Sequence, residues 1–264
     1  MEYTKVAEKA LAEVRASVPL VHNITNYVAM DVTANALLAI GASPAMIHAG
    51  EEVEDFVTIA SALVVNIGTL SREWVVSMTA AADRAGQLGK PWVLDPVGAG
   101  ATPYRTSVAR DLSRRGPTVI RGNASEILAL AGATDAAPKG VDSTQASEAA
   151  REIAGNLART LDCTVAVTGA VDYVTDGNRV LAVANGDPMM TRVTALGCAA
   201  TALTGAFLAV ENDAVLAAAS ALGVFGLAGE LAARNSEGPG TLRWRILDEL
   251  YRMDAAALSG VRIS

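Results

Sequence analysis

The chain has 264 residues, of which 51% are hydrophobic and 4% aromatic, and its net charge is −7. This length suits one α/β domain with a sizeable core. The acidic balance, with no basic cluster longer than Arg114-Arg115, argues against a nucleic-acid partner and favours a small molecule. Two cysteines, Cys163 and Cys198, are too few for a disulfide framework, and the N-terminus does not resemble a signal peptide, so we expect a cytoplasmic protein.

Hydrophobicity leaves two alternatives to an ordinary monomer. The mean hydropathy of +0.31 is high, which favours an oligomer that hides apolar surface. The uncharged runs 193–210 and 214–229 are also long enough for a membrane hairpin. Both runs are rich in Ala, Gly and Thr and lack flanking aromatic belts or a Lys/Arg bias, so we expect no membrane partner.

In chain order, strands alternate with helices. An amphipathic helix is expected at 5–17, where apolar residues share one side. The expected strands are 20–26, 45–48, 62–68, 91–95, 117–121 and 164–168, and the expected helices between them are 27–40, 51–60, 71–88, 103–113 and 124–131. Segment 172–184 is typical of a hairpin that turns at Asp176-Gly177.

This alternation predicts a three-layer αβα fold, with a mostly parallel central sheet and helices on both faces. We expect a single domain over 1–264, because no repeat or linker divides the chain. The segment nearest to a boundary is 132–143, which is short enough to be a surface loop.

Polar residues gather where the predicted strands end. In such a sheet, ligands bind beyond the carboxyl ends of the strands. Those ends carry Asn23, Thr25, Met46, His48, Asn66, Asp95, Arg121, Asn123 and Thr168. The sequence therefore predicts a polar crevice along this edge.

The stretch 185–207 is the centre of this prediction. Its loop 193–198 leads into an apolar run, 199–210, with helical spacing. Free backbone N–H groups are expected at Gly197, Cys198, Ala199 and Ala200. Together with the helix dipole they form a site for an anion such as a phosphoryl group, with Cys198 at its mouth.

Two carboxylates are candidate Mg²⁺ ligands. Asp95 ends an apolar strand, and Glu126 opens a helix three residues beyond Asn123. Mg²⁺ needs one or two carboxylates when substrate phosphates complete its ligands. The alternatives are a capping box between Asn123 and Glu126, and a turn closed by Asp95.

Three further residues have two interpretations each. Arg121 ends an apolar run and binds either phosphate or a structural carboxylate. Thr168, before Gly169, contacts a nucleotide or begins a turn. Cys198 is either a small buried residue or a thiol whose pKa is lowered by the helix N-terminus, and we expect the second.

Other sites find little support. Cys163 precedes a buried strand and is expected in the core. His22 and His48 are not spaced as a metal pair, and no zinc spacing, Walker A motif or dinucleotide fingerprint is present in the sequence.

Several of these segments resemble one family, the hydroxyethylthiazole kinases of thiamine salvage, within the ribokinase-like fold. The similarity covers nearly the whole chain. It rests on Val21-His-Asn-Ile-Thr-Asn-Tyr27, Gly41-Ala-Ser-Pro-Ala-Met46, Leu94-Asp-Pro-Val-Gly-Ala-Gly-Ala-Thr-Pro-Tyr-Arg105, Arg121-Gly-Asn-Ala-Ser-Glu126 and Met190-Thr-Arg-Val-Thr-Ala-Leu-Gly-Cys198.

The resemblance implies transfer of the ATP γ-phosphoryl group to 4-methyl-5-(2-hydroxyethyl)thiazole with Mg²⁺. It also implies a homotrimer with active sites at subunit interfaces, and no separate lid domain. Carried over by position, Met46 and Ala195 line the thiazole pocket with Asn23 close by, Arg121 and Thr168 contact ATP, and Asp95 and Glu126 lie on the metal and phosphate side. Cys198 matches the position of the aspartate base in the wider ribokinase-like group, and is the candidate catalytic residue.

One position departs from the pattern. The family loop commonly reads Thr-Gly-x-Gly-Cys, whereas this chain has Ala195 in place of the first glycine. A methyl group there restricts positive φ and narrows the substrate's approach. Three alternatives therefore stay open: a kinase for a related alcohol such as hydroxymethylpyrimidine, a nucleotide-dependent dehydratase, and a catalytically silent binding protein.

Overall fold

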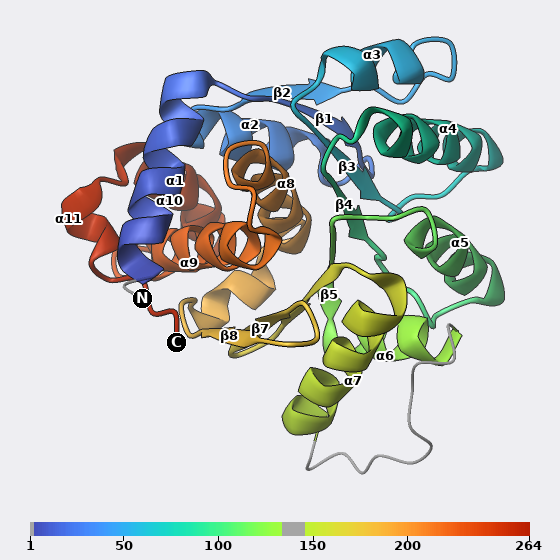
Figure 1. Ribbon diagram of the computed structural model, residues 1–264. Helices are drawn as coiled ribbons and strands as arrows, with labels where there is room; N and C mark the ends of the chain where they lie inside the picture. Colours follow the sequence, from blue (N-terminus) through green and yellow to red (C-terminus); the bar gives the residue numbers. More distant parts are fainter. Residues whose placement is uncertain (1–2, 134–145) are drawn as a thin grey trace.

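The computed structural model describes residues 3–133 and 146–264 (Figure 1). Its strands are β1 (Leu20–Ile24), β2 (Ser43–Met46), β3 (Ala62–Asn66), β4 (Trp92–Asp95), β5 (Val119–Asn123), β6 (Thr164–Thr168), β7 (Asp172–Thr175) and β8 (Val180–Val183). They form an eight-stranded sheet in the order β2-β1-β3-β4-β5-β6-β7-β8. Strands β1 to β6 are parallel, and β7 and β8 add antiparallel at one edge.

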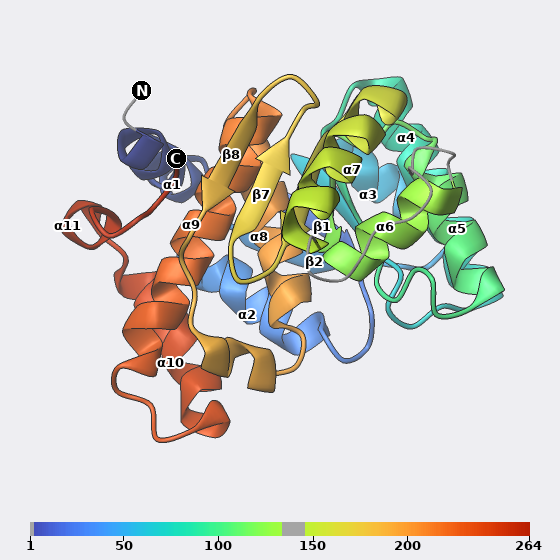
Figure 2. The ribbon, with the colours of Figure 1, turned by 90° about the horizontal axis from the view of Figure 1, so that it is seen from below.

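Helices cover both faces of this sheet (Figures 1 and 2). One face carries α1 (Tyr3–Ser17), α2 (Met30–Ile40), α8 (Leu196–Leu208), α9 (Ala214–Ala233) and α10 (Pro239–Arg252). The other carries α3 (Val53–Ile59), α4 (Arg72–Leu88), α5 (Pro103–Ser113), α6 (Ala124–Ala133) and α7 (Ala146–Leu161). The expected three-layer αβα architecture is confirmed, and the described residues show no separate lid domain.

The two faces hold separate apolar clusters because successive strand side chains point to opposite sides. In β3, Val64 packs with α8 and α9, while Leu63 and Val65 pack on the opposite face with α4. Strands buried on both faces read as continuous apolar runs, as this one does.

The helices and their boundaries differ from expectation in several places. Helix α2 begins at Met30 rather than at residue 27, because the N–H of Ala29 donates to both the carbonyl and the side-chain oxygen of Asn26 and closes a turn there. Helices α7, α9, α10 and the short α11 (Ala255–Leu258) were not predicted, although the uncharged run 214–229 lies inside α9. Most of the expected loop 132–143 lies outside the described residues.

Helix α8 also begins earlier than predicted. A 3₁₀ helix, η2 (Pro188–Arg192), precedes it, and α8 starts at Leu196. Gly197 and Cys198 therefore lie in the first helical turn and not in a loop. Ala195 is the N-cap residue, with φ of 65°.

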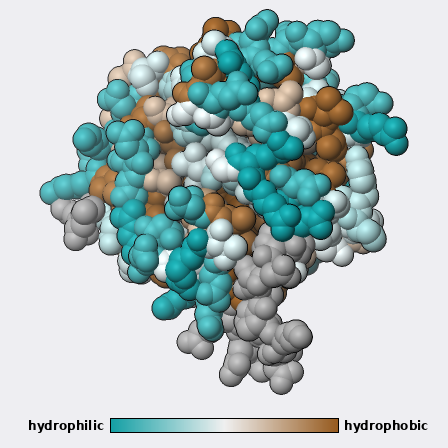
Figure 3. Space-filling view, turned by 45° about the vertical axis from the view of Figure 1, so that its right-hand side comes forward, coloured by the Kyte–Doolittle hydropathy of each residue, from teal (hydrophilic) through white to brown (hydrophobic). Residues whose placement is uncertain are grey.

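Among the described helices, α9 has the length and apolar composition of a membrane span. It is mostly buried, with α1, α8 and α10 packed against it. On the molecular face shown in Figure 3, hydrophobic areas are broken up by hydrophilic residues. The burial of α9 is that of a core helix.

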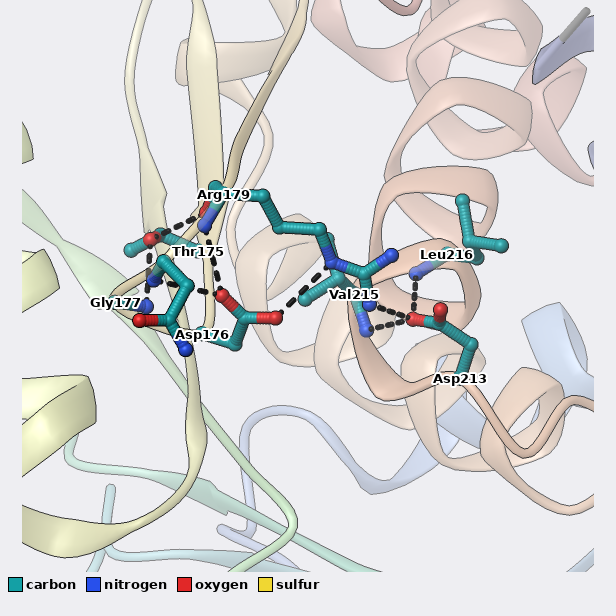
Figure 4. A network of polar contacts seen from close by, with 8 residues as sticks. Thr175, Asp176, Gly177, Arg179, Asp213, Val215 and Leu216 are labelled. Atoms are coloured by element: carbon teal, nitrogen blue, oxygen red, sulfur yellow. Dashed lines mark hydrogen bonds and ion pairs between the residues drawn. The ribbon is translucent and has the colours of Figure 1, made fainter. Parts of the chain in front are cut away.

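Arg179 ties the β7–β8 hairpin to the start of α9 (Figure 4). Its guanidinium forms ion pairs with Asp176 in the hairpin turn and with Asp213. Asp213 in turn caps α9 by accepting from the N–H groups of Val215 and Leu216, both at 3.1 Å. These contacts anchor the β7–β8 hairpin, whose first residue is Asp172, on the N-terminus of α9.

Candidate active site

The carboxyl ends of the parallel strands meet the N-terminus of α8. Asn66 at the end of β3 lies beside Asp95 at the end of β4, and Asn123 of β5 lies beside Thr168 of β6. Helix α8 packs across β1, β3 and β4. The crevice predicted from the sequence is thus assembled at the sheet's edge.

Asp95 is buried beneath α8, with 1% of its surface exposed. Its Oδ2 accepts hydrogen bonds of 2.7 Å from Asn66 Nδ2 and from Thr201 Oγ1. Its Oδ1 is buried and has no hydrogen-bond partner among the described residues. Burial raises the pKa of Asp95 to about 6, although Arg121 and the hydrogen bond from Thr201 oppose the rise.

The first turn of α8 presents backbone donors to the crevice. The N–H groups of Leu196, Gly197 and Cys198 have no partner within the helix. The N–H of Ala199 donates to the carbonyl of Ala195 at 3.0 Å, so the expectation that Ala199 is free was wrong. The N–H groups left free by the helix therefore begin one position earlier in the chain than predicted, and Ala200 lies inside the helix rather than at its start.

Cys198 is half-buried at the mouth of this turn. Its Sγ receives a hydrogen bond from Asn26 Nδ2 at 3.3 Å. Burial and the charge of Asp95 raise the pKa of the thiol, outweighing the lowering by Asn26, Asn66 and Arg121. The expectation of a lowered pKa was wrong, because desolvation of the sulfur dominates.

Arg121 lies against the same turn, as its position at the end of an apolar run predicted. A Cβ atom on Gly197 would lie 2.9 Å from Arg121 Nη1, so a side chain at this position would push the guanidinium out of its present place. The Nε of Arg121 is buried and lacks a hydrogen-bond partner among the described residues. Arg121 also lowers the pKa of Asp95 and Asp172, so it is close to carboxylates as well as to the predicted anion site.

A cavity of about 600 Å³ opens beside Arg121. Its polar lining residues include Arg121, Thr168 and Asp172, and Thr168 Oγ1 also donates to the carbonyl of Gly122 at 3.3 Å. The lining residues of its apolar part are Pro188, Met190, Leu196, Ala200, Leu222 and Phe225. A cavity lined by both charged and apolar side chains suits a ligand that has charged and apolar parts, such as a nucleotide.

Asp172 lines the same cavity. Its Oδ1 accepts from the N–H of Gly169 at 2.9 Å. Burial raises the pKa of Asp172 to about 6, against the lowering by this hydrogen bond and by Arg121.

Glu126 forms the capping box that the spacing allowed. The N–H of Asn123 donates to Glu126 Oε2 at 2.9 Å, and Asn123 Oδ1 accepts from the N–H of Glu126 at 2.9 Å. The other carboxylate oxygen, Oε1, accepts from the N–H of Gly98 at 2.8 Å. Glu126 thus joins the loop after β4 to the start of α6, and each of its oxygens keeps one lone pair for a further contact.

Two of the residues predicted to line the thiazole pocket lie at the carboxyl ends of β1 and β2, away from the cavity beside β5 and β6. Met46 is half-buried at the end of β2, beside Asn23 of β1. Asn23 is buried and donates to the carbonyl of Val21 at 2.9 Å, while its Oδ1 has no described partner. Ala195, the third predicted residue, is the N-cap of α8 and directly precedes Leu196 and Gly197, which line the cavity beside Arg121.

The histidines have structural contacts. His22 donates through Nε2 to the carbonyl of Ile47 at 2.7 Å and packs edge-on against Phe56. His48 packs against Trp74. In the part of the chain that the structure describes, no three His, Cys, Asp or Glu residues cluster as metal ligands. Cys163 is buried as expected, and burial raises its pKa to about 12.

Three residues of the site were not singled out from the sequence: Asn26, Thr201 and Asp172. Thr201 is three residues beyond Cys198, which places both on one side of α8. Asn26 closes the polar run after β1, and Asp172 begins the hairpin after Thr168-Gly169. Only the fold shows that all three approach the groups at the strand ends.

Comparisons with known proteins agree with this geometry. The model of the hydroxyethylthiazole kinase family matches residues 11–256. A hydroxyethylthiazole kinase of Granulibacter bethesdensis is 56% identical over 248 residues, covering 94% of this chain and 90% of that protein. The structure of the hydroxyethylthiazole kinase protein from Pyrococcus horikoshii OT3 superposes with a TM-score of 0.93 at 47% identity, covering 98% of both chains.

A more distant structure fixes the fold class. A ribokinase-like superfamily protein from Enterococcus faecalis superposes with a TM-score of 0.68 at 12% identity, covering 94% of this chain and 95% of that one. The ribokinase-like fold expected from the sequence is confirmed. Since the family match extends over the strand ends and the first turn of α8, where the candidate groups gather, the chain belongs to the hydroxyethylthiazole kinase family.

Proposed function

We propose that this chain transfers the γ-phosphoryl group of ATP to the hydroxyl of 4-methyl-5-(2-hydroxyethyl)thiazole, as a cytoplasmic thiamine-salvage kinase with one domain over 1–264. The observation that carries the proposal is the half-buried Arg121, whose Nε is buried and has no hydrogen-bond partner among the described residues. It lies against the N–H groups of the α8 first turn and opens onto a cavity of about 600 Å³. Such an arrangement stabilises the charge of a transferring phosphoryl group by preorganised donors.

The cavity is the proposed ATP site. Arg121 meets the polyphosphate through its fork of donors, and Thr168 adds a hydroxyl to the same lining. The apolar lining, which includes Leu222 and Phe225, suits the base. The N–H groups of Gly197 and Cys198 then face the γ-phosphoryl group.

Asp95 fits a role beside Mg²⁺, because its buried Oδ1 has an unused lone pair and no described partner. Glu126 fits the outer side of such a site, because both its oxygens already accept backbone N–H groups and each can take one contact more, such as a metal-bound water. When bound, Mg²⁺ would neutralise charge on the phosphates. The protein's part is to hold Asp95 fixed through Asn66 and Thr201.

The alcohol is proposed to approach Cys198 from the side of Met46, Ala195 and Asn23. The raised pKa of Cys198 leaves it a neutral thiol at neutral pH, so we assign it to orienting the alcohol rather than to taking its proton. In-line attack then depends mainly on holding the hydroxyl oxygen opposite the leaving ADP.

We further propose the homotrimer, with sites at subunit interfaces. Tyr27 and Val28 follow Asn26 of the site and are 67% and 59% exposed. Trp244 and Tyr251 expose one side of α10. Light scattering should give three times the chain mass of 27.1 kDa, and a monomer at micromolar concentration would contradict the assembly.

The test of the activity is ADP release by the purified protein with Mg·ATP, with and without hydroxyethylthiazole, and the mass of the product. We expect thiazole-dependent ADP formation and a phosphorylated thiazole. Absence of turnover, with thermal stabilisation by either ligand, would instead favour a different alcohol substrate or a binding protein.

A further inference from the structure

A buried chain of hydrogen bonds joins Cys198 to Asp95 through two asparagines. Asn26 Nδ2 donates to Cys198 Sγ at 3.3 Å and to Asn66 Oδ1 at 2.8 Å. Asn66 Nδ2 donates to Asp95 Oδ2 at 2.7 Å. The thiol at the mouth of the crevice is therefore connected to the buried carboxylate by two asparagines from separate segments of the chain.

The direction of this chain is fixed by the backbone. The N–H of Ala29 donates to Asn26 Oδ1 at 3.0 Å, and the N–H of Gly68 donates to Asn66 Oδ1 at 2.9 Å. A backbone N–H can only donate, so each of these contacts identifies the amide oxygen. The nitrogen of Asn26 must then face the sulfur, and both of its hydrogens are used.

Packing leaves the Asn26 amide one position. Its residue is 5% exposed, and Asn66 is 1% exposed. A Cβ atom on Gly68 would lie 2.6 Å from the Asn26 side chain, so a bare glycine makes room for it. The amide is thus held between the backbone of Gly68 and the side chain of Asn66.

We propose that Asn26 is a positioning residue for Cys198, holding the sulfur as a hydrogen-bond acceptor so that the thiol's own proton is directed at the substrate alcohol. The amide nitrogen of Asn26 donates one hydrogen to Cys198 Sγ and the other to Asn66 Oδ1. This nitrogen is not an acceptor, so the S–H group of Cys198 cannot donate to it. The S–H bond must therefore point elsewhere, and the open side of Cys198 is the crevice. The relevance to turnover rests on the proposed function, but the coupling of Asn26 to Cys198 does not.

The decisive variant is Asn26→Asp, which keeps the shape but places a carboxylate oxygen where the donor was. The thiol proton would then bond to that carboxylate, and the thiolate would be disfavoured. The readout is the rate of Cys198 alkylation by iodoacetamide against pH, measured on the Cys198 peptide by mass. Buried Cys163, whose pKa is raised to about 12, should stay unmodified as long as the protein is folded and so reports on unfolding. We expect the midpoint to rise by at least about one pH unit, so that alkylation below the midpoint slows about tenfold.

Two controls separate this role from a general effect. Asn178→Asp makes the same chemical change at an exposed turn between β7 and β8 and should leave the profile unchanged. Asn26→Ala removes the donor without adding charge and should raise the midpoint by less than the aspartate does. If Asn26→Asp does not fold, as judged by circular dichroism, Asn26→Ala decides the question.

Kinetics complete the test. Asn26→Asp should lower kcat about tenfold and leave the KM for ATP within about twofold, because Asn26 does not line the nucleotide cavity. An unchanged alkylation profile in both Asn26 variants would overturn the proposal. That includes the case in which kcat falls, because Asn26 would then act on the substrate directly. If the wild-type protein shows no kinase activity, the proposed function fails, while the alkylation profiles still decide whether Asn26 controls Cys198.

Discussion

Ala195 adopts a backbone conformation that disfavours its own side chain. It has φ of 65° and ψ of 5° at the N-cap of α8, the left-handed region in which a Cβ atom crowds the carbonyl oxygen. The loop of the family that this chain resembles commonly has glycine at this position. Replacing Ala195 by glycine should therefore relieve strain.

The expected gain is small because three effects compete. Relief of the left-handed strain is worth about 1–2 kcal/mol. The more flexible glycine offsets about 0.4–1 kcal/mol by its entropy in the unfolded chain. Loss of a half-exposed methyl group removes roughly 0.3 kcal/mol, less than the value for a fully buried one. The net stabilisation by Ala195→Gly is then about 0.5 kcal/mol.

A matched substitution makes the strain measurable. Ala101→Gly, in the exposed loop before α5, shares the entropy effect but not the strain, because Ala101 has no positive φ. We expect it to destabilise the protein by about 0.4–1 kcal/mol. Urea unfolding at one protein concentration should therefore separate the two variants by about 1 kcal/mol or more. Equal losses of stability in both would refute the strain at Ala195.

Three further substitutions test the site. Arg121→Ala should raise the Kd for ATP about 10- to 100-fold, since charge-assisted hydrogen bonds contribute about 1.5–3 kcal/mol, and an unchanged calorimetric titration would exclude Arg121 from the ATP site. Cys198→Ser should lower kcat roughly tenfold with ATP affinity intact, and full turnover would remove Cys198 from the mechanism. Asp172→Asn should stabilise the fold at pH 7.5 by about 2 kcal/mol. The native pKa of about 6 lies above the unfolded value of 3.8, so ionisation opposes folding increasingly between about pH 4 and 6. Urea unfolding at pH 4 and 7.5 should show the difference only at the higher pH.

The layers of the fold could be predicted because the strands are short apolar runs between helical patterns. The strand that contains Val64 and Val65 can be recognised without knowing which face of the sheet each side chain meets, because both faces are buried. The start of α2 was misplaced because a side-chain contact from Asn26 closes a turn before the helix. The start of α8 was misplaced because Ala195, not a usual capping residue, stands at its N-cap.

The candidate site was predictable where one strand end carried one group, as with Asp95 and Arg121. It was not predictable where the role depends on a neighbour distant in sequence. Gly68 leaves room for Asn26, which is 42 residues away in the sequence, and Gly197 leaves room for Arg121, which is 76 residues away. The predicted direction of the Cys198 pKa shift was wrong for the same reason. The burial of the thiol and its closeness to Asp95 result from packing that no local sequence pattern contains.

The charges around Arg121 explain why the site should favour an anion that brings a cation with it. Arg121 interacts with two carboxylates, the buried Asp95 and the half-buried Asp172, and the pKa of each is raised to about 6. Both are therefore mainly ionised at neutral pH, and one guanidinium faces two negative charges. A bare polyphosphate would add to that excess, whereas a polyphosphate with a divalent cation relieves it. Burial makes this imbalance matter, because little water reaches these groups to screen it.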